Sequence, residues 1–156
     1  MDFDDLLDAV LIADLATLGR YLDEGVPVDR LHRGLTLLML GIGGGNEKTI
    51  EMLLERGADI RAKDRHGNTP LAHAVFSNRT TVAERLIDLG ADVNQVDDKG
   101  NTPLHYALVH SKGDPSMIRM LLRQGADPDH RNAAGLSCRQ IVTEYRGEWD
   151  YSSLFR

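Results

Sequence analysis

The sequence predicts an all-α solenoid in which helix-turn-helix units stack side by side. One octapeptide occurs twice with a spacing of 33 residues: residues 64–71 read DRHGNTPL, and residues 97–104 read DDKGNTPL. Residues 85–94 repeat the pattern of residues 52–61 with the same spacing, and both segments contain Gly-Ala-Asp. Aromatic residues make up only 5% of the chain, which suits a thin aliphatic core between layers. A fixed period of this length is the signature of a stacked repeat protein.

The repeated unit resembles the ankyrin repeat. The resemblance rests on Thr-Pro-Leu-His at residues 102–105 and on Thr-Pro-Leu at residues 69–71. It also rests on the Gly-Ala-Asp that follows each second helix, at residues 57–59, 90–92 and 125–127. The family's fold is a solenoid of helix-turn-helix repeats joined by β-hairpin loops, and this fold is what the resemblance implies here.

By this resemblance, the chain is a single domain over residues 1–156, with about four repeats plus a C-terminal cap. Terminal repeats lack a neighbour on one side and carry a polar outer face, which the N-terminal aspartates supply. The expected parts are an N-terminal capping repeat at 1–29, repeats at 30–63, 64–96 and 97–131, and a C-terminal cap with an aromatic tail at 132–156.

Charge is unevenly distributed along the chain. Residues 1–29 hold eight acidic residues and one basic residue, whereas the remaining chain has 16 acidic and 17 basic residues. Nucleic-acid-binding proteins show a basic face, so we expect no nucleic acid partner. The sequence has no apolar run long enough to span a bilayer, and acidic residues stand where a secretory signal needs basic ones. With Cys138 as the single cysteine, these features predict a cytoplasmic protein without a membrane contact.

The second repeat departs from the regular pattern in two places. The connection from Gly25 to Gly34 is one residue shorter than the later connections, and Pro27 removes a backbone donor, so we expect an irregular hairpin. Glycines then occupy positions 41 and 43–45 in the first helix. Because each interior glycine costs up to about 1 kcal/mol relative to alanine, we expect this helix to be short or frayed at that end.

The third and fourth repeats are more regular. Thr69 is expected to cap a helix that has Pro70 in its first turn, and Gly90 is expected to end the following helix in a left-handed conformation. The resemblance implies that His105 hydrogen-bonds the hydroxyl of Thr102. The second helix of the third repeat is expected to bury Val82, Leu86 and Ile87.

The C-terminal segment concentrates aromatic area. We expect Trp149, Tyr151, Leu154 and Phe155 to fold back over the last helix and cover its apolar face; the alternative is a peptide that docks elsewhere. Cys138 stands in the first turn of that last helix, where a small buried residue is a better interpretation than a nucleophile.

The sequence predicts no catalytic residue, no metal and no cofactor. Its six histidines show no ligand-type spacing with cysteine or acidic residues on one helix. We find no paired carboxylates, no Ser-His-Asp arrangement and no phosphate-binding loop. An enzyme with an unusual site around Cys138 or the histidines stays an alternative, and a Cys138→Ser variant would test it.

The resemblance also implies a concave contact surface for a partner protein. Its contact positions are the two residues before each hairpin glycine, the residue after it, and the last two residues of each first helix. Phe76 is expected to be the main anchor, as an exposed aromatic residue near the middle of the stack. The predicted partner-binding residues are His32, Arg33, Leu35, Arg65, His66, Asn68, Phe76, Ser77, Asp98, Lys99, Asn101, Val109 and His110. The same rule also marks Gly43, Gly44, Ala133, Ala134 and Leu136.

The sequence therefore predicts a non-catalytic module that binds another protein and is monomeric when free. The chain starts almost at its first cap and ends just after its last, so we expect a free-standing inhibitor, sequestering partner or adaptor. A bacterial immunity protein that blocks a toxin is one such inhibitor. The main alternative is a structural unit that self-associates through its C-terminal aromatic residues.

Overall fold

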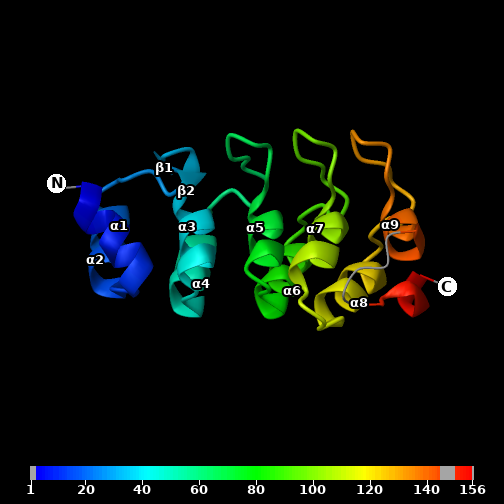
Figure 1. Ribbon diagram of the computed structural model, residues 1–156. Helices are drawn as coiled ribbons and strands as arrows, with labels where there is room; N and C mark the ends of the chain where they lie inside the picture. The colour runs from blue at the N-terminus through cyan, green and yellow to red at the C-terminus, as the bar shows by residue number, and fades with distance from the viewer. Residues whose placement is uncertain (1–2, 145–149, 156) are drawn as a thin grey trace.

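The computed structural model describes residues 3–144 and 150–155, which form a row of helix pairs (Figure 1). The first helix of each pair packs against the first helices of the neighbouring pairs. The first helices are α1 (Phe3–Ile12), α3 (Leu37–Gly44), α5 (Pro70–Phe76), α7 (Pro103–His110) and α9 (Cys138–Glu144). The second helices are α2 (Leu15–Asp23), α4 (Glu47–Glu55), α6 (Thr80–Asp88) and α8 (Ser116–Arg123), and the 3-10 helix η1 (Ser152–Phe155) follows α9. The predicted all-α solenoid is confirmed.

The loops between helix pairs project from the same edge of the row (Figure 1). In the first loop, β1 (Leu31–His32) and β2 (Leu35–Thr36) pair antiparallel. The two turn residues, Arg33 and Gly34, both have a positive φ, of 51° and 84°. Two left-handed residues are typical of the two-residue turn whose twist matches that of the strands. The prediction of an irregular hairpin is therefore wrong, because the shorter connection closes as a tight turn.

The starts of the first helices follow the sequence pattern. The Thr69 hydroxyl accepts a hydrogen bond from the Ala72 amide at 3.5 Å, and Pro70 occupies the first turn. Its missing amide proton costs nothing there. Thr36 caps α3 in the same way, accepting from the Met39 amide at 3.3 Å. The predicted cap at Thr69 is confirmed.

His105 ties its own helix to two loops. Its Nδ1 lies 2.9 Å from the Thr102 hydroxyl, as predicted, and its Nε2 lies 3.1 Å from the Leu136 carbonyl of the next loop. A carbonyl only accepts, so Nε2 carries the proton and Nδ1 accepts from Thr102. Burial lowers the pKa of His105, which keeps the ring neutral. The histidine therefore joins two successive repeats.

One aliphatic core runs through the row. Leu53, Leu86 and Leu121 occupy corresponding positions on α4, α6 and α8, and each is 0% exposed. Val82 is buried as predicted, whereas Ile87 is only half-buried at the edge of the core. Burial of these side chains supplies the main stabilisation of the stack. Within the described ranges, no helix is long and apolar enough to cross a membrane.

The glycine-rich helix α3 is not short. It spans eight residues, against seven for α5. Gly41 lies in the buried seam, where an added Cβ would stand 3.4 Å from Thr49 Cγ2, so a small residue fits there. Packing therefore overrides the low helix propensity, and the length prediction is wrong. Gly45 ends the helix with a φ of 85°, and Gly90 has a φ of 97°, which confirms its predicted left-handed conformation.

The C-terminal aromatic residues cover the end of the stack. Tyr151 is 7% exposed and Phe155 is 6% exposed, and Leu154 packs against the same core. The Tyr151 hydroxyl lies 2.6 Å from Ser111 Oγ in the loop before α8. The predicted fold-back is confirmed for these residues, while Trp149 lies outside the described residues.

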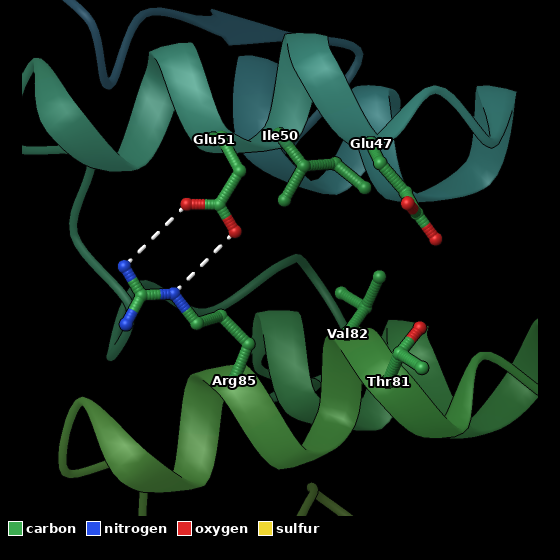
Figure 2. A pocket seen from close by; sticks show the side chains of 6 residues that line it. All are labelled: Glu47, Ile50, Glu51, Thr81, Val82 and Arg85. Atoms are coloured by element: carbon green, nitrogen blue, oxygen red, sulfur yellow. Dashed lines mark hydrogen bonds and ion pairs between the residues drawn. The ribbon is translucent and has the colours of Figure 1, made fainter.

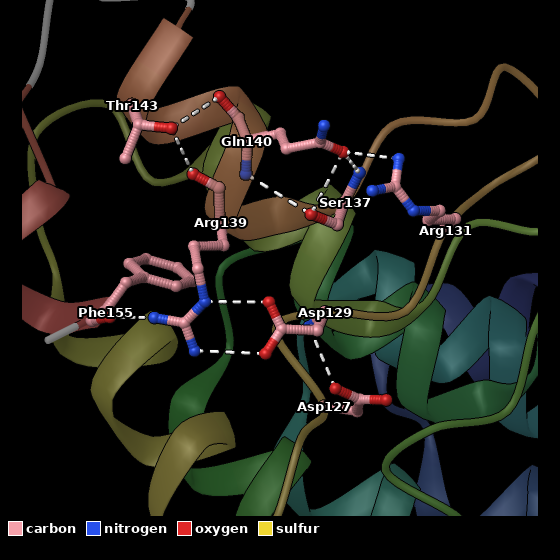
Figure 3. Close-up of polar contacts among 8 residues, drawn as sticks. All are labelled: Asp127, Asp129, Arg131, Ser137, Arg139, Gln140, Thr143 and Phe155. Carbon is pink, nitrogen blue, oxygen red and sulfur yellow. Dashed lines mark hydrogen bonds and ion pairs between the residues drawn. The ribbon is translucent and has the colours of Figure 1, made fainter.

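Arg139 fastens this end of the chain (Figure 3). Its guanidinium donates to both carboxylate oxygens of Asp129, at 2.7 and 3.1 Å, and to the main-chain carbonyl of Phe155. The bidentate contact holds the loop before α9 against α9, and the third hydrogen bond holds α9 against η1. Beside it, Gln140 accepts a hydrogen bond from Arg131 at 2.8 Å.

Candidate partner-binding surface

The ends of the first helices form a row that we call the helix-end row. Leu11, Gly43, Phe76 and Val109 occupy corresponding positions near the ends of α1, α3, α5 and α7. Val109 is 74% exposed and Leu11 is 47% exposed, while Phe76 is half-buried. Large apolar side chains are thus presented on successive repeats, with a gap at Gly43. Exposed apolar side chains that recur at the same position of several repeats are candidates for contact with a partner.

The sequence predicted an exposed ring at Phe76, but the structure shows this ring packed among other rings. Its ring centroid lies 4.4 Å from that of Tyr106 in an edge-to-face arrangement, and 5.6 Å from the rings of both His73 and His110. Phe76 is half-buried because it bridges α5 and α7, so the expectation of an exposed ring is corrected. Edge-to-face aromatic contacts hold a ring in a defined orientation. Sequence reasoning missed Tyr106, although it stands 33 residues after His73.

The loop before α5 is organised by the Asp64 carboxylate. It accepts hydrogen bonds from the amides of His66 and Asn68, at 2.8 and 2.9 Å. The Asn68 side chain donates to the same carboxylate at 3.1 Å, and His73 Nε2 lies 3.0 Å from it. Asn68 is only 8% exposed as a result. This is a correction: Asn68 stabilises the loop and leaves little surface for a partner.

The loop before α7 repeats this arrangement around Asp97. Its carboxylate accepts from the amides of Lys99 and Asn101, at 2.9 and 2.8 Å, and from the hydroxyl of Tyr106. Asn101 is half-buried, and its side-chain Oδ1 accepts a hydrogen bond from the side chain of Asn132 in the next loop at 2.8 Å. Asn101 is thus also used within the stack.

These contacts shift the acidity of the groups involved. Burial alone would raise the pKa of Asp64, but hydrogen bonds from Asn68, His66 and His73 outweigh it, so the pKa is lowered. Asp97 behaves alike, since the hydrogen bonds from its neighbours outweigh burial and lower its pKa. Burial and the bond to Asp97 raise the pKa of Tyr106 to about 12. At neutral pH both aspartates are ionised and Tyr106 is a hydrogen-bond donor.

The other predicted contact residues divide by exposure. The predicted positions at the loop tips are called the tip row: His32, Arg33, Leu35, Arg65, His66, Asn68, Asp98, Lys99, Asn101, Ala133, Ala134 and Leu136. Most of these residues, and most of those at the helix ends, are accessible. The exposed ones are Arg33, Gly43, Gly44, Arg65, His66, Ser77, Asp98, Lys99, Val109, Ala133 and Ala134. The half-buried ones are His32, Leu35, Phe76, Asn101, His110 and Leu136.

The second helices carry a groove that sequence reasoning missed. It lies between α4 and α6, has a volume of about 290 Å³, and is lined by Glu47, Ile50, Glu51, Thr81, Val82 and Arg85 (Figure 2). Ile50 and Val82 form its apolar floor, and Arg85 reaches Glu51 at 3.4 Å across one side. Its polar walls are thus already paired in part. The groove depends on side-chain size, which the repeat pattern does not reveal.

Cys138 is unsuited to nucleophilic chemistry. The side chain is 0% exposed, and burial raises the pKa of its thiol to about 12. The reactive form of cysteine is the thiolate, which this environment disfavours. In the part of the chain that the structure describes, no group of three or more His, Cys, Asp or Glu side chains is placed to hold a metal ion.

The chain belongs to the ankyrin-repeat family, whose three-copy repeat pattern matches residues 6–97 and 65–132. The human B-cell lymphoma 3 protein is 38% identical over 104 residues, which is 66% of this chain and 22% of that protein. The mouse RelA-associated inhibitor is 33% identical over 78 residues, 49% of this chain and 10% of that protein. The phosphocholine transferase AnkX of Legionella pneumophila is 32% identical over 80 residues, 48% of this chain and 8% of that protein. The chain thus spans less than a quarter of each of these three relatives.

Membership of this family makes the chain a protein-interaction module. The solenoid presents its tip row and helix-end row on a rigid scaffold, which is how a repeat protein offers an extended binding surface.

Proposed function

We propose that this protein binds another protein through its tip row and helix-end row, without catalysing a reaction, and acts as an inhibitor, sequestering partner or adaptor. The observation that carries the proposal is the helix-end row, where Leu11, Phe76 and Val109 present apolar surface on three repeats. Interface energy concentrates in a few central anchors, and aromatic residues are enriched among them. Phe76 is the central member of this row, and its ring is already oriented by Tyr106.

The names of the relatives bear on the finer role. One is called an inhibitor and another a transferase, but the chain covers only 10% and 8% of them. Their partners and activities therefore do not carry over. An immunity protein that neutralises a bacterial toxin is one form of inhibitor, and co-expression with a neighbouring toxin gene would test it.

The proposal includes a monomeric, cytoplasmic protein. Tyr151 and Phe155 are buried against their own chain, which leaves them little surface for self-association. Light scattering over a concentration series separates a monomer from the alternative assembly unit. The lone thiol of Cys138 supports a reducing compartment.

The test is to capture the partner from the native cell and measure its affinity for variants. Phe76→Ala should weaken binding by at least about 1 to 2 kcal/mol, mainly through faster dissociation. Leu89→Ala is the matched control, because Leu89 is an exposed apolar residue (42%) at the end of a second helix. Equal affinity for both variants and the wild type would move the interface off the helix-end row.

A further inference from the structure

The first two loops carry an unusual concentration of positive charge. Residues 29–36 and 59–68 contain five basic residues and three acidic residues, Asp29, Asp59 and Asp64. All five basic residues are exposed, whereas the Asp64 carboxylate is 4% exposed and faces His73. The accessible charge of these two loops is therefore positive, although the protein as a whole has a net charge of −6.

The two loops form a continuous surface. The Asp59 amide donates to Asp29 Oδ1 at 2.8 Å, which ties one loop to the other. The Arg65 stem lies across Gly34, with its Cβ 3.7 Å from the position that a Cβ on this glycine would occupy. Arg65 of the second loop is thus placed next to Arg33, the residue before Gly34. We call Arg33, Arg61, Lys63 and Arg65 the basic loop surface.

These four cations are not used to hold the fold together. Ion pairs join Arg56 to Asp23, Arg85 to Glu51 and Arg139 to Asp129, and His73 lies 3.0 Å from Asp64. None of them involves a member of the basic loop surface. The charges are therefore available to an external group.

The repeats themselves supply a control for this reading. In the third loop, Asn94, Val96 and Asp98 stand 33 residues after Arg61, Lys63 and Arg65. That loop projects like the second and closes through the same aspartate-centred hydrogen bonds. Basic side chains at these positions are therefore not required by the backbone.

We propose that the basic loop surface docks an acidic segment of the protein partner, rich in aspartate and glutamate. The inference rests on the proposed function and names the chemistry of that partner. Arginine guanidinium groups bind carboxylates through two parallel hydrogen bonds. Three of the four members of the basic loop surface are arginines, which suits them to aspartate and glutamate side chains. A nucleic acid fits less well, because proteins that bind nucleic acids are basic along a whole face, whereas this positive surface is confined to two loops of a protein with a net charge of −6.

The test uses a fluorescein-labelled octapeptide of alternating aspartate and glutamate, with an Asn/Gln octapeptide as its neutral match. Anisotropy titrations at low ionic strength should show binding of the acidic peptide alone, weakening as salt is added. The double variant Arg61→Glu, Arg65→Glu should bind at least about tenfold more weakly than the wild type. The double variant Arg119→Glu, Arg123→Glu makes the same charge change on exposed residues of α8, and should stay within about twofold.

Three outcomes would overturn the inference. One is an equal loss of affinity for the acidic peptide in both double variants, which would show that net charge alone explains binding. Another is no binding of the acidic peptide by a wild-type protein that melts cooperatively. The third is tighter binding of a thymidine oligonucleotide through the same residues. The peptide titration needs no captured partner, so failure of the acidic peptide to bind is distinguishable from failure of the helix-end row to bind that partner.

Discussion

The loop before α3 and the loop before α5 project from the same edge of the stack, but different interactions hold them in place. The first is closed by main-chain pairing of β1 with β2, and it has Leu31 and Leu40 where the second has Asp64 and His73. The second also has a main-chain hydrogen bond, from the Asp64 amide to the Asn68 carbonyl at 2.9 Å, and in addition the Asp64 carboxylate binds two amides, an asparagine side chain and a histidine of the following helix. The carboxylate fastens the loop to its helix, but it also makes that loop sensitive to a single side chain and to pH.

The largest effect should come from the core beneath both loops. Leu86→Ala should lower the free energy of unfolding by about 2 to 5 kcal/mol, because a fully buried side chain leaves a cavity. Leu53→Ala at the corresponding position of α4 should fall in the same range. Chemical denaturation gives both values. A loss under about 1 kcal/mol for Leu86→Ala would show that the core is not continuous through the third repeat.

The comparison itself is tested at equivalent loop positions. Asp64→Ala should cost about 1 to 3 kcal/mol, since it leaves the amides of His66 and Asn68 without their acceptor. Leu31→Ala should cost within about 0.5 kcal/mol, because Leu31 is 58% exposed and its loop closes through the main chain. If urea denaturation showed the same loss of unfolding free energy for both variants, the two loops would not be held in different ways.

Acid should act on the carboxylate-closed loops. The pKa values of Asp64 and Asp97 are held below the ordinary value of 3.8, so their stabilisation is complete above that value and is lost as pH falls through the lowered pKa. The melting temperature should fall between about pH 5 and about pH 2. The variant Asp64→Asn, Asp97→Asn should show a shallower decline over that interval, with the remainder due to other carboxylates such as Asp129. An unchanged slope would rule the two aspartates out as its source.

The smallest expected effect concerns the gap in the helix-end row. A Cβ added to Gly43 would meet no heavy atom within 4 Å, and Gly43 is helical. Gly43→Ala should therefore stabilise the protein by about 0.5 to 1 kcal/mol through helix propensity alone. Thermal melting measures this gain, and a loss of stability would mean that the space is occupied.

The sequence predicted the repeat architecture well because each 33-residue period corresponds to one helix pair with its loop. The cap at Thr69 and the turn at Gly90 were predicted from local signals, and the bond between His105 and Thr102 was implied by the resemblance to the ankyrin repeat. Propensity misled us about α3, because Gly41 packs in a seam where a small residue fits.

Side-chain partners across repeats were harder to predict. Position alone marked Asn68 as a contact residue, although Asp64, four residues earlier, engages its amide. The packing of Phe76 on Tyr106 joins two repeats. The rule for contact positions treats each repeat separately, so it cannot predict such pairs. The same rule found Arg33 and Arg65 but missed Arg61 and Lys63, because it considers only tips and helix ends.

The most direct test of the account is hydrogen exchange of the protein alone and in complex with its captured partner. The account predicts slower exchange in the complex at residues 61–67, 76–78 and 109–112, with little change in α6 and α8. That pattern would place the partner on the tip row and helix-end row, since exchange slows where amides are covered. Slowing confined to α4, α6 and α8, or to residues 151–155, would contradict the account and place the interface on the second helices or the C-terminal segment.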